Sequence, residues 1–277
     1  AVIFLGMNDY QNFYADNGKV LVKETEDWES AYRDKIKTHL DILSANTKKV
    51  YWLGMPIVRN KIYNAQLLYI EDLHKKVLNV IQAELSQNNM EIYQLADRPD
   101  LQNRILDILL PQLIYTARRN YVTGVFLIID APTPMIKVDE FLYPGLYIRN
   151  DDPASYSSNN EDILVSRGPA EVVQKHNIAL GGNWEPNFTI SRCNKDSSCR
   201  YFNAPIFGVF RHPDWSPKDL GFWSPSFKLD HLSNEVITYS IPIIDKQGNI
   251  YGVIGIDLSA KYIQSFLNFD ELDMSKE

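Results

Sequence analysis

The sequence predicts an α+β fold in which long helices come first and an antiparallel sheet follows. In the first half of the chain, apolar residues recur every three or four positions, which is the spacing of an amphipathic helix. After Thr123 they gather in short blocks typical of strands, and the last two blocks flank a turn at residues 245–249. Helices followed by antiparallel strands are typical of the α+β class.

The first 76 residues are expected to form a strand, a helix and a second strand. Residues 2–5 are a short apolar run, a helical spacing extends over residues 27–43, and residues 50–53 are a second run stopped by Gly54. Two buried strands around a helix make a parallel βαβ unit. Because a parallel sheet must be covered on both faces, we expect this unit to be only part of a fold.

Two helical tracts follow the βαβ unit. The first keeps its apolar spacing from Leu67 through about Leu95, and the second starts at Pro99, a residue suited to the first position of a helix. Pro111 lies within the second apolar stripe and is expected to kink or end the helix there. Both stripes are interpreted as core packing.

The later segments are mostly strands, apart from one long aperiodic stretch. Residues 184–227 are rich in aromatic residues and proline, and loops of that length in a compact domain usually serve function. The predicted elements after Thr123 are strands at 124–129 and 145–149, a short helix at 169–176, the hairpin strands at 235–244 and 250–257, and a closing helix at 258–267.

The excess of acidic over basic residues argues against a nucleic-acid partner. The 277 residues include 28 Lys and Arg against 35 Asp and Glu, a formal net charge of −7. Nucleic-acid binding depends on basic side chains that neutralise phosphates, so we expect no nucleic-acid partner. No apolar run approaches the roughly 18 residues needed to cross a bilayer. The sequence shows no metal-ligand spacing of His and Cys and no glycine-rich phosphate loop, so we expect neither a metal nor a cofactor.

The two cysteines lie close together in a polar loop. Cys193 and Cys199 suit a local disulfide in an oxidising compartment. The alternative is that they are two unrelated free thiols.

The predicted hairpin resembles a known family of sensor domains. Its residues are Ile237-Thr238-Tyr239-Ser240-Ile241-Pro242-Ile243-Ile244-Asp245, then Gly248, then Tyr251-Gly252-Val253-Ile254-Gly255-Ile256-Asp257-Leu258-Ser259. With the helix before residues 124–129 and the stretch at 145–151, this pattern is similar to the extracytoplasmic Cache domains of bacterial receptors, from about Val80 to Leu272.

The Cache resemblance implies a PAS-like antiparallel sheet packed on a long N-terminal helix, in a domain of residues 77–277. In that family the domain lies between two membrane spans and binds a small molecule. The resemblance therefore implies the extracytoplasmic sensor lobe of a membrane-anchored, dimeric receptor with a kinase, cyclase or chemoreceptor output. Its expected partner is a small polar ligand, such as an amino acid, an amine or a small carboxylate.

Residues 1–76 look like a fragment of an SGNH/GDSL hydrolase. The block Gly6-Met7-Asn8-Asp9 matches that family's G-x-N-D block, whose Asn donates to the oxyanion. Catalysis also needs a serine nucleophile and a histidine base held by an acid. No serine precedes Asn8, and no His has an Asp three residues before it. We therefore expect no enzyme, and an SGNH-type esterase of the cell envelope is the alternative.

Asp257 is the first candidate for a ligand contact. It ends the strand at 250–257, where amino-acid-binding Cache domains place an acid that pairs with the ligand amine. In the alternative, Asp257 caps the closing helix that starts at Leu258. The two roles are compatible.

Arginine and aromatic side chains supply the other candidates, because an ammonium group prefers a π face and a ligand carboxylate needs Arg or backbone donors. Residues 200–202 resemble an Arg-aromatic stretch of amino-acid-binding Cache domains with altered spacing, whereas Trp223 and Phe227 are wall residues or ordinary core. Tyr147 and Arg149 share one strand face, either pocket or solvent. The candidate ligand-binding residues are Asp257, Arg200, Tyr201, Phe202, Trp223, Phe227, Tyr239, Tyr147 and Arg149.

Overall fold

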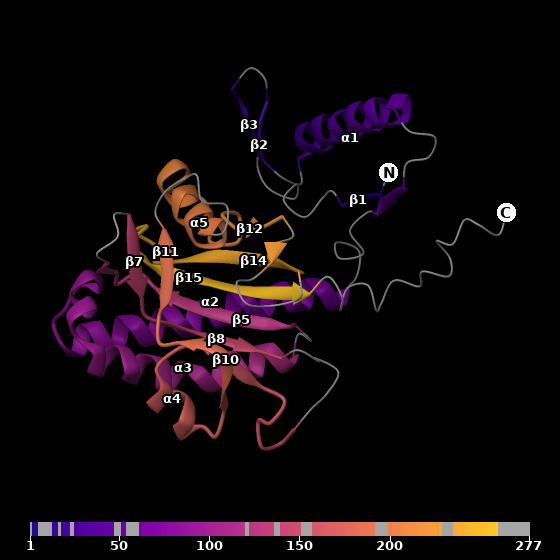
Figure 1. Ribbon diagram of the computed structural model, residues 1–277. Helices are drawn as coiled ribbons and strands as arrows, with labels where there is room; N and C mark the ends of the chain where they lie inside the picture. The colour runs from indigo at the N-terminus through magenta and orange to yellow at the C-terminus, as the bar shows by residue number, and fades with distance from the viewer. Residues whose placement is uncertain are drawn as a thin grey trace, which may run out of the picture. The chain divides into compact units, whose positions relative to one another are not determined.

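The computed structural model places two compact units along the chain, Ala1–Leu67 and Leu68–Glu277 (Figure 1). The described residues are 2–4, 13–15, 18–22, 25–46, 51–53, 61–119, 122–135, 139–150, 157–191, 199–225, 227–228 and 235–259. The sequence-based division at residue 76 rests on family resemblances and stays a prediction.

The first unit contains the predicted strand–helix–strand order. Strand β1 (Val2–Phe4) pairs in parallel with β4 (Tyr51–Leu53), and α1 (Glu26–Asn46) lies between them in the chain. Thr25 begins the helix, because its Oγ1 accepts a hydrogen bond from the Trp28 backbone N–H at 3.3 Å. A short antiparallel pair, β2 (Phe13–Tyr14) and β3 (Val20–Leu21), was not predicted.

The second unit is built on one large sheet, antiparallel except for the β9–β10 edge. In the described part of the chain its order is β10-β9-β8-β5-β15-β14-β12, and β13 also pairs with β14. The strands are β5 (Gly124–Ile129), β8 (Gly145–Arg149), β9 (Leu164–Arg167), β10 (Ala179–Glu185), β12 (Phe222–Trp223), β13 (Phe227–Lys228), β14 (Glu235–Ile244) and β15 (Ile250–Ser259). The predicted α+β class, hairpin and central strands are confirmed.

The prediction of a closing helix is wrong at its first two residues. Leu258 and Ser259 continue β15, whose pairing with β14 extends to the Val236–Ser259 pair. The rest of that predicted helix, residues 260–267, lies outside the described residues.

Two long helices precede the sheet in the chain. Helix α2 (Lys61–Gln87) ends before Leu95, because Asn89 takes a left-handed φ of 50° and a separate turn of 3-10 helix, η1 (Ile92–Asp97), follows. Helix α3 (Pro99–Arg119) starts at the predicted proline but runs past Pro111, so the prediction that it could end there is wrong. No helix in the described ranges is long and apolar enough to cross a membrane.

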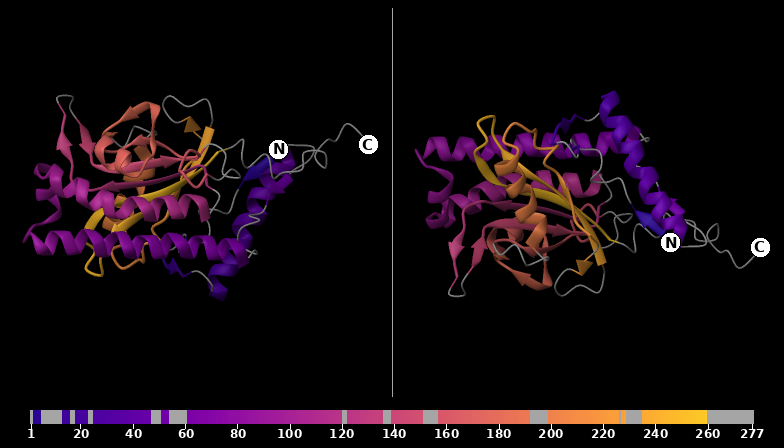
Figure 2. Two further views of the ribbon diagram at one scale, coloured as in Figure 1. Left: turned by 90° about the horizontal axis from the view of Figure 1, so that it is seen from below. Right: turned by 90° about the horizontal axis from the view of Figure 1, so that it is seen from above.

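The helices of the second unit lie on opposite faces of the sheet. Helix α3 packs against β5 and β8, whereas α5 (Arg200–Arg211) packs against β14 and β15. Figure 2 shows α2 and α3 together along one face of the sheet. The long segment at 184–227 is therefore not a loop: it contains α5, and its strand β11 (Phe188–Ser191) joins β7 (Glu140–Tyr143) and β6 (Thr133–Pro134) in a second small sheet. Helix α4 (Ala170–Lys175) confirms the predicted short helix.

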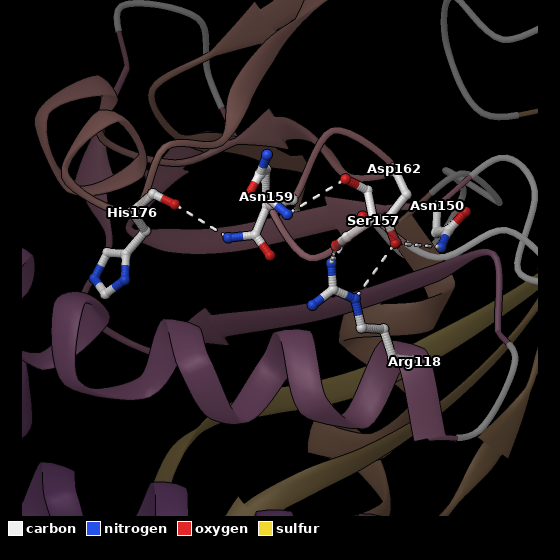
Figure 3. Close-up of polar contacts among 7 residues, drawn as sticks. Arg118, Asn150, Ser157, Asn159, Asp162 and His176 are labelled. Atoms are coloured by element: carbon white, nitrogen blue, oxygen red, sulfur yellow. Dashed lines mark hydrogen bonds and ion pairs between the residues drawn. The ribbon is translucent and has the colours of Figure 1, made fainter.

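An ion pair ties the end of α3 to the turn before β9 (Figure 3). One Arg118 Nη donates to Asp162 Oδ1 at 2.7 Å and to the Ser157 backbone carbonyl at 2.8 Å, and Arg118 Nε donates to Asp162 Oδ2 at 3.3 Å. The Asp162 side chain is only 2% exposed, so this carboxylate depends on Arg118 for its charge compensation.

Candidate functional site

The face of the large sheet that lies under α5, here named the α5 face, carries the candidate site. Phe126, Ile128 and Val253 pack on it in one apolar cluster with Phe202 of α5. Directly paired residues of neighbouring antiparallel strands point to the same face, and alternate residues along a strand share it. The registers of β12, β14, β15, β5 and β8 therefore set two rows of side chains across this face.

Polar residues dominate the first row and aromatic residues the second. The first row, in strand order, is Thr238, Asp257, Gly124 and Arg149. The second row is Phe222, Ser240, Gly255, Phe126 and Tyr147.

Asp257 sits at the centre of the first row with its carboxylate turned inward. The residue is only 2% exposed. Tyr147 Oη donates to Asp257 Oδ2 at 2.6 Å, and Thr238 Oγ1 donates to Oδ1. Thr123 fixes the strand end, because its backbone N–H and its Oγ1 both donate to the Asp257 carbonyl at 2.9 Å.

The environment of Asp257 makes its charged form more costly than it is in water. Burial raises the pKa of the Asp257 carboxyl, while the hydrogen bonds from Thr238 and Tyr147 and the positive charge of Arg149 oppose that rise. Burial and the charge of Asp257 raise the pKa of Tyr147 well above its usual value, so this phenol stays protonated and donates. A cation that reached the carboxylate would relieve the cost of its burial.

Two glycines let aromatic rings cross the face. A Cβ at Gly124 would lie 2.8 Å from Tyr147 Cε2 and 3.2 Å from Asp257 Oδ2. A Cβ at Gly255 would lie 2.3 Å from Phe126 Cζ. Tyr147 thus reaches Asp257 over Gly124, and the Phe126 ring lies over Gly255, because neither position carries a side chain.

The N-terminal turn of α5 covers the second row. The Tyr201 ring meets Phe126 edge-on, with centroids 5.3 Å apart, and the Arg200 guanidinium lies 5.2 Å from the centroid of Phe222. Phe202 packs in the same apolar cluster as Phe126, and its ring centroid lies 4.7 Å from that of Tyr143.

The structure brings together only part of the predicted set. Asp257, Tyr147 and Arg149 share the α5 face, and Tyr147 is buried, so the solvent alternative for this face does not hold at Tyr147. Trp223 and Tyr239 lie on the opposite face, because Tyr239 is next to Thr238 along β14 and neighbouring residues of a strand point to opposite faces. Their ring centroids are 4.7 Å apart. The predicted residues that the structure places on the α5 face or over it are Asp257, Tyr147, Arg149, Arg200, Tyr201 and Phe202.

Two further predictions concern the ends of β15 and β14. The helix-cap alternative for Asp257 is wrong, because Leu258 and Ser259 are strand. Phe227 lies in β13, where it pairs with Val236 at one end of β14.

Sequence reasoning missed Thr238, Ser240 and Phe126. Thr238 and Ser240 could have been found from the hairpin turn, because the turn sets the register of the two strands and the register decides which β14 residue opposes Asp257. Phe126 has no such signal, since its place beside Gly255 depends on a pairing between β5 and β15 that are far apart in the sequence.

The cysteine pair stays a prediction. Cys199 is buried and its Sγ accepts a hydrogen bond from the Ser191 backbone N–H at 3.4 Å, whereas Cys193 lies outside the described residues. Within the ranges that the structure describes, no group of three His, Cys, Asp or Glu could hold a metal ion.

A family model matches the first part of the chain. A protein family described as "Protein of unknown function (DUF459)" matches residues 1–92, and its description names no activity. No curated protein matches the chain.

Among solved structures, those similar to this chain include sensory domains of the Campylobacter jejuni chemoreceptor Tlp3. The ligand-binding domain in complex with 4-methylisoleucine is 17% identical, with 76% of this chain and 66% of that chain covered and a TM-score of 0.30. The complex with L-norvaline is 16% identical, with coverage of 76% and 65% and a TM-score of 0.30. The sensory domain described without a ligand is 16% identical, with coverage of 74% and 64% and a TM-score of 0.29. This chain spans less than two thirds of the length of these three domains.

Proposed function

We propose that the second unit is a ligand-binding sensor lobe that captures a small molecule with a protonated amine on the α5 face. The observation that carries this proposal is the Asp257 carboxylate, which is buried and is hydrogen-bonded by two neutral donors, Tyr147 and Thr238. Neutral hydroxyl donors carry no charge to offset that of an ionised carboxylate, and Arg149, two strands away, offsets only part of it. An ammonium group supplies both the missing charge and a strong, charge-assisted hydrogen bond.

The side chains around Asp257 suit the rest of such a ligand. Phe126 and Tyr201 meet edge-to-face and offer aromatic surface to an ammonium group. Arg149 lies two strands from Asp257 in the same row, and Arg200 lies over Phe222. A guanidinium pairs well with a carboxylate, so an α-amino acid is the ligand class that would use both kinds of charge.

The wider context of the proposal comes from the Cache resemblance of the hairpin. On this proposal, the second unit is the extracytoplasmic lobe of a membrane-anchored, dimeric bacterial receptor with a kinase, cyclase or chemoreceptor output. The ligand would shift that receptor toward its signalling state by the difference between its affinities for the two states. Closure of α5 over the sheet is the change that a ligand between them would favour.

The test is the affinity of an Asp257→Asn variant. A thermal-shift screen against amino acids, amines and small carboxylates identifies ligands, because a bound ligand stabilises the folded protein by mass action. For an amine found in this way, calorimetry is expected to show a loss of about 10- to 150-fold in affinity, which is the worth of one charge-assisted hydrogen bond. Asp214→Asn, at an exposed position after α5, is the control and should bind normally. An unchanged affinity in Asp257→Asn would exclude Asp257 as a ligand contact.

An acyl-hydrolase activity of residues 1–76 is the second candidate, favoured by the resemblance of Gly6-Met7-Asn8-Asp9 to the G-x-N-D block of SGNH hydrolases. Asn8, its proposed oxyanion donor, lies outside the described residues. Because the nucleophile and base are missing from the sequence, we expect no turnover of a short-chain nitrophenyl ester. Turnover that is lost in Asn8→Ala would favour the hydrolase instead.

A further inference from the structure

We infer that Ser240 is a specificity-determining contact of the proposed site, and that it selects an amine with a hydroxyl group on the neighbouring carbon. The inference rests on the proposed function and extends it to a ligand class. Ser240 is fully buried at the middle of β14, with 0% of its surface exposed. Among the residues that the structure describes, its Oγ has no hydrogen-bond partner.

A buried hydroxyl without a partner is costly. It loses its hydrogen bonds to water and gains none from the protein, which destabilises the fold relative to alanine at the same position. Other buried hydroxyls nearby do have partners: Thr238 Oγ1 donates to Asp257, and Ser224 Oγ accepts from the Thr238 backbone N–H at 2.9 Å. Ser240 differs from these hydroxyls in having no partner among the described residues, and a bound ligand with a polar group at this place would supply one.

The position of Ser240 places its hydroxyl beside the amine site. It follows Thr238 by two residues along β14, so it points to the α5 face, and its direct partner on β15 is Gly255. Phe222 pairs with it on the other side, and the Phe126 ring lies over Gly255. These neighbours are aromatic or lack a side chain, so they offer the Ser240 hydroxyl no strong acceptor.

The spacing then fixes the ligand class. Asp257 and Ser240 are diagonal neighbours on one face of an antiparallel pair, a relation that separates two residues by about 7–8 Å. Their two side chains can therefore each make a hydrogen bond of about 2.9 Å to one small ligand. The ligand's amine and hydroxyl must therefore lie close together, as on adjacent carbon atoms. L-Threonine has this arrangement, and L-valine has the same shape with a methyl group in place of the hydroxyl.

The experiment compares these two amino acids by calorimetry on the whole chain. The wild-type protein is expected to bind L-threonine about 3- to 10-fold more tightly than L-valine, the range that one neutral hydrogen bond gives. Ser240→Ala should remove this preference by weakening L-threonine while leaving L-valine unchanged or slightly tighter. Equal affinities in the wild-type protein, or a preference that survives in Ser240→Ala, would overturn the inference.

Thermal unfolding without ligand gives an independent readout. Ser240→Ala should melt at the same temperature as the wild type or up to about 3 °C higher, because it removes an unpartnered polar group. Ser224→Ala, which loses a buried hydrogen bond, should melt at a lower temperature and serves as the matched variant. An equal loss in both variants would show that Ser240 has a structural bond and would overturn the inference.

The outcomes also separate the two proposals. If neither amino acid binds but another amine binds in an Asp257-dependent way, the assignment of Ser240 to a hydroxylated amino acid fails and the proposed function stands. If no amine, amino acid or carboxylate binds at all, both fail.

Discussion

Replacement of Arg118 by alanine is expected to lower the free energy of unfolding by about 3–5 kcal/mol, the usual cost of leaving a buried charge without its partner. The Asp162 side chain is 2% exposed, and both of its carboxylate oxygens accept hydrogen bonds from Arg118. The variant also loses the bond from Arg118 to the Ser157 carbonyl, so the turn before β9 loses its tie to α3. Urea denaturation followed by tryptophan fluorescence measures the loss.

Two controls show whether the uncompensated charge is the cause. The double variant Arg118→Ala/Asp162→Ala should be more stable than Arg118→Ala alone, because it removes the orphaned carboxylate. Arg98→Ala breaks an ion pair with Asp100 in which both side chains are largely exposed, and it should cause no measurable loss. An Arg118→Ala variant as stable as Arg98→Ala would contradict the role of this pair.

Acidification from pH 7 to pH 4 is expected to remove about 3 kcal/mol of stability through His74 alone. His74, on α2, is 7% exposed, and its Nε2 accepts a hydrogen bond from the Ile244 backbone N–H at 3.3 Å, so the ring must be neutral. Burial, aided by the charge of Lys75, lowers the pKa of His74 from 6.5 to about 4. A hydrogen bond with the Pro242 backbone acts in the opposite direction and raises this pKa, but by less.

The sign follows from proton binding. Between pH 6.5 and about pH 4 the unfolded chain binds a proton at His74 that the folded protein does not, so stability falls as the pH falls through this window. Urea denaturation at several pH values checks it, with His74→Gln as the control, since the amide oxygen can still accept from Ile244 but does not titrate. The wild-type protein should lose more stability than this variant over the window. Identical slopes would contradict the prediction.

The sequence predicts correctly those helices and strands whose pattern lies within a few consecutive residues. The hairpin, β5 and β8 are at their expected places because runs of β-branched residues and a tight turn act over a few residues. Helix α5 was not predicted because the whole stretch at 184–227 is rich in aromatic residues and proline with little periodicity, although Phe202, Ile206 and Val209 keep a helical spacing within it. Tertiary packing overrode the local signal at that segment.

The site was predicted only where one strand contains the information. Asp257, and Tyr147 with Arg149, came from single strands, and the structure places all three on one face. The sequence favours Trp223 and Tyr239 equally, since no sequence pattern says which face of a strand buried on both sides meets a ligand. Burial on both faces of β14 removes the alternation of polar and apolar residues that would have shown it.

The glycines under Tyr147 and Phe126 limit how this protein can be redesigned for a different solute. Any larger residue at Gly124 or Gly255 would collide with the ring of Tyr147 or Phe126 before it met a ligand, so it would displace that ring instead of reshaping the site. Engineering should therefore begin at Arg200 and Tyr201 on α5, which can change size or charge while the strands beneath keep their pairing.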